Sequence, residues 1–128
     1  MAKILVIDDD DATRGVLREL LEEEGHVVME AADGSSGLQV FRERSADLVV
    51  VDIVMPGKNG VTTLGELHME SPQTKIIAIS GADPSEALAD LPIAWAFGAV
   101  RSMQKPLLPS SFLRVVEELL ASAQPAPL

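Results

Sequence analysis

The feature that most limits how this chain can fold is an apolar run over residues 48–51 (Leu-Val-Val-Val) that ends in a carboxylate, Asp52. Proline and glycine residues that are typical of a loop follow shortly after it. A continuous run of branched apolar residues indicates a strand that is covered on both faces, as in a parallel sheet. Asp52 is then expected at the carboxyl end of that strand, where open α/β sheets bind their ligands.

Strands are also predicted at residues 4–7, 26–31 and 75–80, which are largely apolar, and at residues 99–104, between Gly98 and Lys105-Pro106. Apolar residues at helical spacing predict helices between the first four strands. These helices run from the acidic residues 8–11 to Gly25, from a turn at Asp33-Gly34 to Arg44, and from Val61 to Ser71.

Two further helices are predicted from capping residues. Asp90 as N-cap, with Pro92 in the first turn, predicts a short helix through Phe97, and a longer helix broken at Pro92 is the alternative. Ser110 or Ser111 is predicted to cap the last helix, whose apolar face begins at Phe112. Residues 124–128 are rich in proline and alanine, so we expect a domain over residues 1–123 and a short tail over 124–128.

Alternation of strands and helices in a chain of 128 residues predicts one α/β domain. The expected architecture is a doubly wound five-stranded parallel sheet of the flavodoxin-like (βα)5 type, in three α/β/α layers. Right-handed crossovers would bring the carboxyl ends of the first, third, fourth and fifth strands together.

Charge and composition exclude several classes of function. The formal net charge is −10, from 20 acidic and 10 basic side chains, which argues against direct nucleic-acid binding. No apolar stretch approaches the about 20 residues of a membrane span, and the short apolar start lacks the features of a secretory signal. We therefore expect no membrane insertion and a cytoplasmic location. Without cysteine the chain can form neither disulfides nor thiolate metal sites.

A set of polar residues lies at the predicted carboxyl ends of the strands: Asp8, Asp9, Asp52, Ser80 and Lys105. Crowded carboxylates repel one another and favour a bound cation, and a hard ion held by one or two carboxylates is typical of Mg²⁺. A carboxylate such as Asp52 is also a nucleophile toward phosphorus and can form an aspartyl phosphate. Lys105 is suited to pair with a phosphoryl oxygen, and Ser80 to donate a hydrogen bond to another.

The neighbouring acids, Asp10 and Asp11, have a simpler interpretation. Negative charge at a helix N-terminus is favourable by about 0.3–1 kcal/mol. We therefore expect Asp10 and Asp11 to do no more than stabilise the start of the first helix.

Several motifs occur together in this chain: Ile4-Leu5-Val6-Ile7-Asp8-Asp9-Asp10, Val51-Asp52-Ile53-Val54-Met55-Pro56 with Gly60, Ile79-Ser80-Gly81, Gly98-Ala99 and Lys105-Pro106. Jointly they resemble a response-regulator receiver domain of two-component signalling, over residues 3–122. In that family the aspartate that matches Asp52 accepts a phosphoryl group from a histidine kinase or a histidine phosphotransfer protein. The resemblance implies a regulatory phosphoacceptor that assists its own phosphorylation and dephosphorylation and switches a surface for a downstream protein.

The same resemblance implies roles for the other site residues. Asp9, Asp52 and the main-chain carbonyl of Val54 would ligate Mg²⁺, and Asp8 would hold a metal-bound water. Ser80 would be the switch hydroxyl and Lys105 the partner of the phosphoryl group.

The chain departs from the family pattern at Ser102. Many receivers carry a tyrosine or phenylalanine at this position, three residues before the lysine, and its rotation couples to the switch hydroxyl. Val54 and Ala82 resemble positions that influence dephosphorylation, and their apolar side chains cannot orient a water molecule by hydrogen bonding. The sequence therefore predicts a long-lived phosphoryl group and a switch that does not use an aromatic residue at position 102.

Two alternatives remain open on the sequence. Residues 9–13 (Asp-Asp-Asp-Ala-Thr) fit the Asp-x-Asp-x-Thr pattern of haloacid-dehalogenase-type phosphatases, with Asp9 as nucleophile. Against it stand the extra Asp8 before the motif and the lack of a later acidic pair for the metal. The other alternative is a receiver-like interaction module that works without phosphorylation. The serine at position 102, where many receivers have an aromatic residue, favours this alternative.

Overall fold

The computed structural model describes residues 1–53, 60–80 and 100–121. Its centre is one sheet of five parallel strands in the order β2-β1-β3-β4-β5. The strands are β1 (Lys3–Ile7), β2 (Val27–Ala31), β3 (Leu48–Asp52), β4 (Lys75–Ser80) and β5 (Val100–Gln104). This order confirms the predicted flavodoxin-like sheet. β3 pairs with a strand on either side, as its unbroken apolar run requires.

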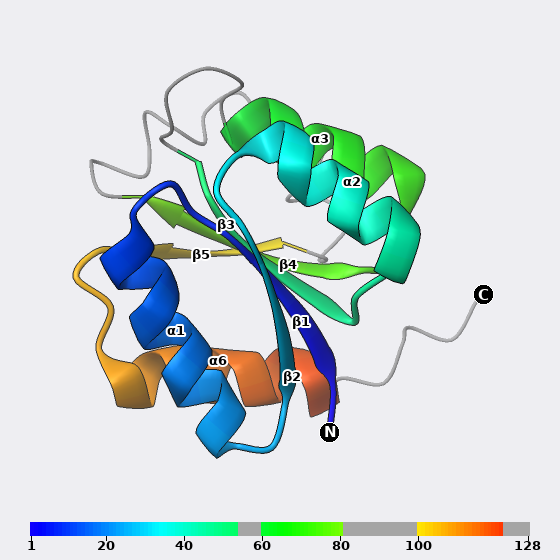
Figure 1. Cartoon of the computed structure of the whole chain (residues 1–128). Helices are drawn as coiled ribbons and strands as arrows, with labels where there is room; N and C mark the ends of the chain where they lie inside the picture. Colours follow the sequence, from blue (N-terminus) through cyan, green and yellow to red (C-terminus); the bar gives the residue numbers. More distant parts are fainter. Residues whose placement is uncertain (54–59, 81–99, 122–128) are drawn as a thin grey trace.

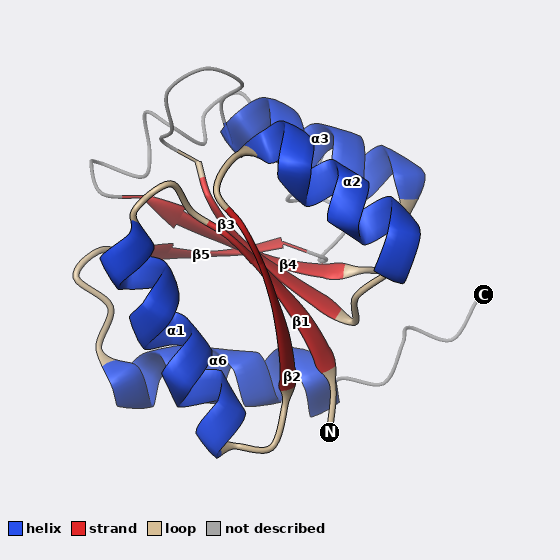
Figure 2. Cartoon of the chain, viewed as in Figure 1, coloured by secondary structure: helices blue, strands red, loops and turns tan. Residues whose placement is uncertain are grey.

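Helices cover both faces of the sheet, which gives the three predicted layers (Figures 1 and 2). Helices α1 (Asp11–Glu23) and α6 (Pro109–Ala121) lie on one face, and α2 (Gly34–Arg44) and α3 (Gly60–Glu70) lie on the other. The predicted helix at residues 90–97 and the predicted tail at residues 124–128 lie outside the described residues.

Alternate strand residues build two separate cores. In β1, Leu5 and Ile7 pack toward α2 and α3, whereas Ile4 and Val6 pack toward α1 and α6. All five residues of β3 are buried. Burying one such side chain contributes about 1.5–3 kcal/mol, so β3 is held from both faces and fixes the position of its last residue, Asp52.

Several predicted element starts need correction, and β1 at Lys3 and α3 at Gly60 each begin one residue earlier than predicted. β2 begins at Val27 because the amide of His26 is taken by the carbonyl of Leu21 (3.2 Å) at the end of α1. Asp33 and Gly34 were expected in a turn, but Asp33 caps α2 by accepting the amide of Ser36, and Gly34 is the first helical residue. α6 begins at Pro109 rather than after Ser110 or Ser111.

The early start of α6 has a simple physical reason. Proline is well suited to the first helical position, where its missing N–H would have no partner in any case. The carbonyl of Leu108 accepts the amide of Phe112 at 2.9 Å, so the first turn of the helix begins before the two serines. None of the helices in the described segments is both long enough and apolar enough to cross a membrane.

Candidate functional site

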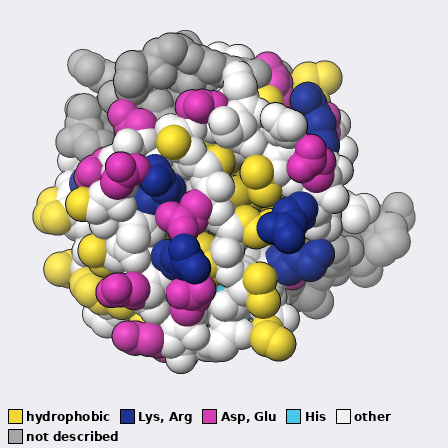
Figure 3. All heavy atoms as spheres, in the orientation of Figure 1, with side chains coloured by type: hydrophobic (Ala, Val, Ile, Leu, Met, Phe, Trp, Pro, Cys, Tyr) yellow, Lys and Arg dark blue, Asp and Glu magenta, His cyan; other side chains and the backbone are white. Residues whose placement is uncertain are grey.

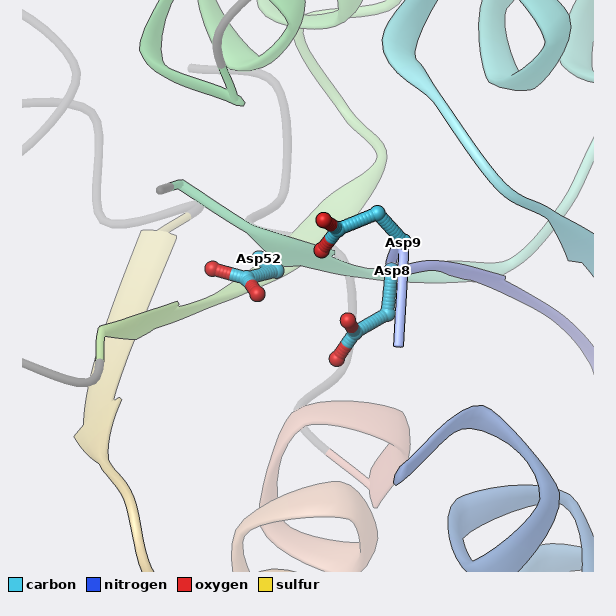
Figure 4. A group of neighbouring side chains, drawn as sticks. All are labelled: Asp8, Asp9 and Asp52. Atoms are coloured by element: carbon cyan, nitrogen blue, oxygen red, sulfur yellow. The ribbon is translucent and has the colours of Figure 1, made fainter. Parts of the chain in front are cut away.

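The sheet register brings two aspartates side by side. Ile7 of β1 lies opposite Val51 of β3, so the next residues, Asp8 and Asp52, leave adjacent strands at the same level. One carboxylate oxygen from each of Asp8, Asp9 and Asp52 lies within 4.8 Å of the others. Figure 4 shows the three side chains extending from the ends of β1 and β3 into the same space. We call these three residues the acidic cluster.

Asp8 is buried and its carboxylate is only half satisfied. Its Oδ1 accepts the amide of Asp10 at 2.9 Å, whereas its buried Oδ2 accepts no hydrogen bond within the described segments. Burial raises the pKa of Asp8, and the negative charges of Asp52 and Asp9 add to the effect, while the Asp10 hydrogen bond and Lys105 oppose it. A buried oxygen with unused lone pairs, in a group that resists ionisation, favours a nearby cation.

Lys105 supplies one such cation. It follows β5 directly, and its Nζ donates to Oδ2 of Asp52 at 3.1 Å and lies 3.6 Å from Oδ2 of Asp8. Burial lowers the pKa of Lys105, but the hydrogen bond and charge of Asp52, together with the charge of Asp8, outweigh burial and raise the pKa overall. Within the described residues, one ammonium pairs with two of the three carboxylates, so the acidic cluster retains an excess of negative charge there.

The other two acids of the run lie at the start of α1. Asp10 is the N-cap and accepts the amide of Ala12 and the hydroxyl of Thr13. The hydroxyl of Thr13 is the main cause that lowers the pKa of Asp10. Asp11 pairs with Arg14. Asp10 and Asp11 thus serve the helix, as expected.

Ser80 and Ser102 are placed by the strands that carry them. Ser80 is the last residue of β4, which pairs with β3 so that Ile79 lies opposite Asp52; Ser80 itself lies opposite Gln104. The backbone of Ser80 therefore lies at the edge of the sheet that carries the acidic cluster. Ser102 lies in β5 opposite Ala78 and is exposed. Val54 and Ala82 fall outside the described residues.

One contact at the site could not be predicted from the sequence. The guanidinium of Arg14, in α1, donates to the main-chain carbonyl of Asp8 at 2.7 Å. A basic residue shortly after an acidic loop is a common sequence feature, and its partner in this case is a backbone atom that the sequence does not identify.

The residues present fit a divalent cation. A hard ion such as Mg²⁺ takes oxygen ligands, which the three carboxylates supply. Among the described residues the buried Oδ2 of Asp8 accepts no hydrogen bond, so it is available to such an ion. Asp9 is exposed, so the cluster is open on one side and leaves room for water or a substrate oxygen. The arrangement combines an acidic cluster suited to a divalent cation with a lysine that pairs with one of its carboxylates, Asp52.

A parallel sheet with this strand order, and an acidic cluster with a lysine at the carboxyl ends of its strands, define a receiver domain of two-component systems. The family model for the response regulator receiver domain matches residues 4–117, and the chain belongs to that family. Membership places the chain among regulatory receivers and not among haloacid-dehalogenase-type phosphatases.

Similar proteins cover nearly the whole chain. Protein PilH of Pseudomonas aeruginosa is 31% identical over 121 residues, which are 94% of this chain and 99% of PilH. Chemotaxis protein CheY of Halobacterium salinarum is 34% identical over 108 residues, which are 83% of this chain and 90% of that protein. The response regulator TrrA of Thermotoga maritima, solved in complex with Mg²⁺-BeF, has a TM-score of 0.81 and 31% identity, with 94% of this chain and 100% of TrrA covered.

Proposed function

We propose that this receiver accepts a phosphoryl group on Asp52 from a phosphohistidine of a histidine kinase or a histidine phosphotransfer protein. A carboxylate oxygen of Asp52 attacks phosphorus, the P–N bond breaks, and the imidazole leaves with the electron pair. The observation that carries the proposal is the pairing of buried Asp52 with Lys105 inside an acidic cluster. Lys105 is then available to neutralise a phosphoryl oxygen.

Magnesium is part of this proposal. Asp9, Asp52 and the main-chain carbonyl of Val54 would hold the ion, and Asp8 would hold one of its waters. When bound, Mg²⁺ neutralises charge on the phosphoryl oxygens. Ser80 would act as the switch hydroxyl by donating a hydrogen bond to the phosphoryl group. Position 102 holds a serine and would transmit the change without an aromatic ring.

The biological role follows from the same proposal. The chain would act in the cytoplasm as a regulatory phosphoacceptor and not as an enzyme with its own substrate turnover, although it assists its own phosphorylation and dephosphorylation. Phosphorylation would shift the population of a conformation that binds a downstream protein. Nucleic acid is not expected as a direct partner, which agrees with the mixed charges on the face shown in Figure 3.

The test uses acetyl phosphate as donor, with and without Mg²⁺. Intact mass and peptide mapping of the wild type, Asp52→Asn and Asp9→Asn show where phosphate is bound. We expect one phosphoryl group on Asp52 that requires Mg²⁺. Phosphate on Asp9 would contradict the proposal. The absence of phosphate, also with phosphohistidine donors, would favour the interaction module that works without phosphorylation.

The lifetime of the phosphoryl group is a separate prediction. Val54 and Ala82 are apolar and cannot orient an attacking water molecule by hydrogen bonding, so we expect slow hydrolysis. The measurement follows the intact mass after the donor is removed, in Mg²⁺. Val54→Asn, which introduces a group able to bind water, should lose the phosphoryl group faster than the wild type. Rapid loss from the wild type would show that this reasoning is wrong.

A further inference from the structure

Arg14 binds three separate parts of the chain with one guanidinium. Its Nη1 donates to the carbonyl oxygen of Asp8 at 2.7 Å, its Nη2 donates to the carboxylate of Asp11, and its Nε donates to Oε1 of Glu30 in β2 at 3.1 Å. The Arg14 side chain is 16% exposed. A planar fork with three partners on three segments has little freedom to move.

The hydrogen bond from Arg14 to the Asp8 carbonyl affects the acidic cluster through the backbone. The Asp8 carbonyl and the Asp9 nitrogen belong to one planar peptide group, so the direction of that carbonyl determines where the Asp9 Cα lies. The exposed Asp9 carboxylate makes no hydrogen bond in residues 1–53, 60–80 or 100–121. The position of the Asp9 carboxylate therefore depends on the backbone that carries it, and Arg14 holds that backbone.

We propose that Arg14 is a positioning residue for cation binding. By fixing the Asp8–Asp9 peptide, it orients the Asp9 carboxylate toward those of Asp8 and Asp52. The inference rests on the proposed function, because it assumes that the acidic cluster binds Mg²⁺. It assigns a role to a residue that contacts neither the metal nor the phosphoryl group.

A neighbouring arginine provides a matched control. Arg18 also binds Glu30, with Nη1 at 2.7 Å from Oε2, and pairs with Glu22, but it makes no hydrogen bond to residues 8–11. Over α1 and β2, Figure 3 shows basic side chains set among acidic ones. Removing Arg18 therefore changes the charge of the same network without releasing the Asp8 carbonyl.

Charge and geometry predict opposite effects on cation affinity. Loss of the positive charge of Arg14 should strengthen binding of Mg²⁺ to nearby carboxylates, because a repulsive cation is removed. Loss of the hydrogen bond to Asp8 should weaken binding, because the Asp9 carboxylate is no longer oriented. The direction of the change therefore distinguishes positioning from simple electrostatics, and Arg14→Lys, which keeps the charge without the fork, separates them further.

The experiment measures the Mg²⁺ dissociation constant by calorimetry for the wild type, Arg14→Met, Arg14→Lys and Arg18→Met, with circular dichroism to establish that each is folded. Supporting residues of metal sites typically change metal affinity by about tenfold or more, so we expect about tenfold weaker binding in Arg14→Met. Arg14→Lys should also be weaker than the wild type, and Arg18→Met should equal or slightly exceed it.

Each outcome decides a separate question. Binding in Arg14→Met and Arg14→Lys that equals or exceeds that of the wild type would overturn the inference and leave the proposed function intact. If Arg14→Met does not fold, the dissociation constant of Arg14→Lys is compared with those of the wild type and Arg18→Met. A wild type that binds no Mg²⁺ would contradict the metal part of the proposed function, and the inference with it.

Discussion

At the scale of single residues, the buried carboxylate of Asp8 lowers the stability of the folded protein because of its place in the sheet. It is buried at the end of β1, beside Asp52, and one of its oxygens accepts no hydrogen bond in the described part of the chain. The raised pKa of Asp8 means that the folded protein disfavours its charged form. A site that prefers a cation is therefore expected to be less stable without one.

We expect Asp8→Asn to raise the free energy of unfolding at neutral pH in the absence of Mg²⁺. The amide has the same shape as the carboxylate but removes a buried negative charge from the acidic cluster. Urea denaturation with a chelator present is the measurement. Addition of Mg²⁺ should reduce the advantage of the variant, because it stabilises the wild type more. A variant that is less stable than the wild type under both conditions would show that the pair with Lys105 outweighs the repulsion.

Site residues differ in how far the sequence could predict them. Asp8, Asp9 and Asp52 follow short apolar runs and Lys105 follows the last strand, so a parallel sheet brings them to one edge once the strands are recognised. The contact of Arg14 with the Asp8 carbonyl depends instead on the angle at which α1 leaves β1. No residue pattern encodes that angle, and the sequence could not reveal the contact.

At the scale of the elements, α2 approaches β1 closely at one glycine. A methyl group at Gly37 would lie 2.8 Å from Cγ1 of Ile7 and closer still to its Cδ1, and Ile7 is fully buried. Gly15 in α1 is a matched control, because no atom would lie within 4 Å of a methyl group there.

We expect opposite effects of alanine at these two positions. Gly37→Ala should destabilise the protein by about 1–3 kcal/mol, the usual cost of overpacking a core. Gly15→Ala should stabilise it by up to about 1 kcal/mol, because alanine is the better helix former. Chemical denaturation of both variants provides the comparison. Equal effects of the two substitutions would show that α2 can move away from the sheet.

The cap of α2 gives a pH dependence with a definite sign. Hydrogen bonds from the backbone and side chain of Ser36 lower the pKa of Asp33 below its ordinary value of 3.8. A lowered pKa in the folded state means that the carboxylate stabilises the fold above pH 3.8, and that this contribution is lost as the pH falls through the folded-state pKa.

The measurement is a carbon NMR titration of the Asp33 carboxyl in the folded protein, with an expected pKa below 3.8. Asp33→Asn keeps a capping side chain without the titration. As the pH falls below 3.8, the wild type should therefore lose stability relative to Asp33→Asn. A pKa at or above 3.8 would contradict the cap.

The elements themselves were predictable, but their ends were not. Each of the described strands and helices coincides with a predicted one, because apolar periodicity reports which face is buried. The starts of β2 and α6 depend on single hydrogen bonds, from the His26 amide and to the Leu108 carbonyl. Competing partners for one amide are nearly equal in energy, so composition cannot select between them.

At the scale of the whole molecule, net charge should govern the response to salt. A net charge of −10 on a compact domain gives self-repulsion that salt screens. We expect NaCl to raise the melting temperature modestly, and MgCl₂ at the same ionic strength to raise it further. Specific binding stabilises by about 2.7 kcal/mol at a hundredfold excess over the dissociation constant.

Asp9→Asn is the control for this comparison. It should keep the response to NaCl and lose most of the additional response to MgCl₂, because it removes one carboxylate of the acidic cluster. Identical curves for the two salts in the wild type would indicate screening alone.

The burial of β3 has a consequence for how a signal can leave Asp52. Hydrogen-bonded neighbours hold this strand on both sides and helices hold it on both faces, so its backbone has no direction in which to yield without breaking several contacts at once. The charge of the phosphoryl group that we propose on Asp52 would then have to be accommodated beyond the ends of the strands. With the sheet fixed, even a small displacement of a connecting segment would change a surface that another protein can recognise.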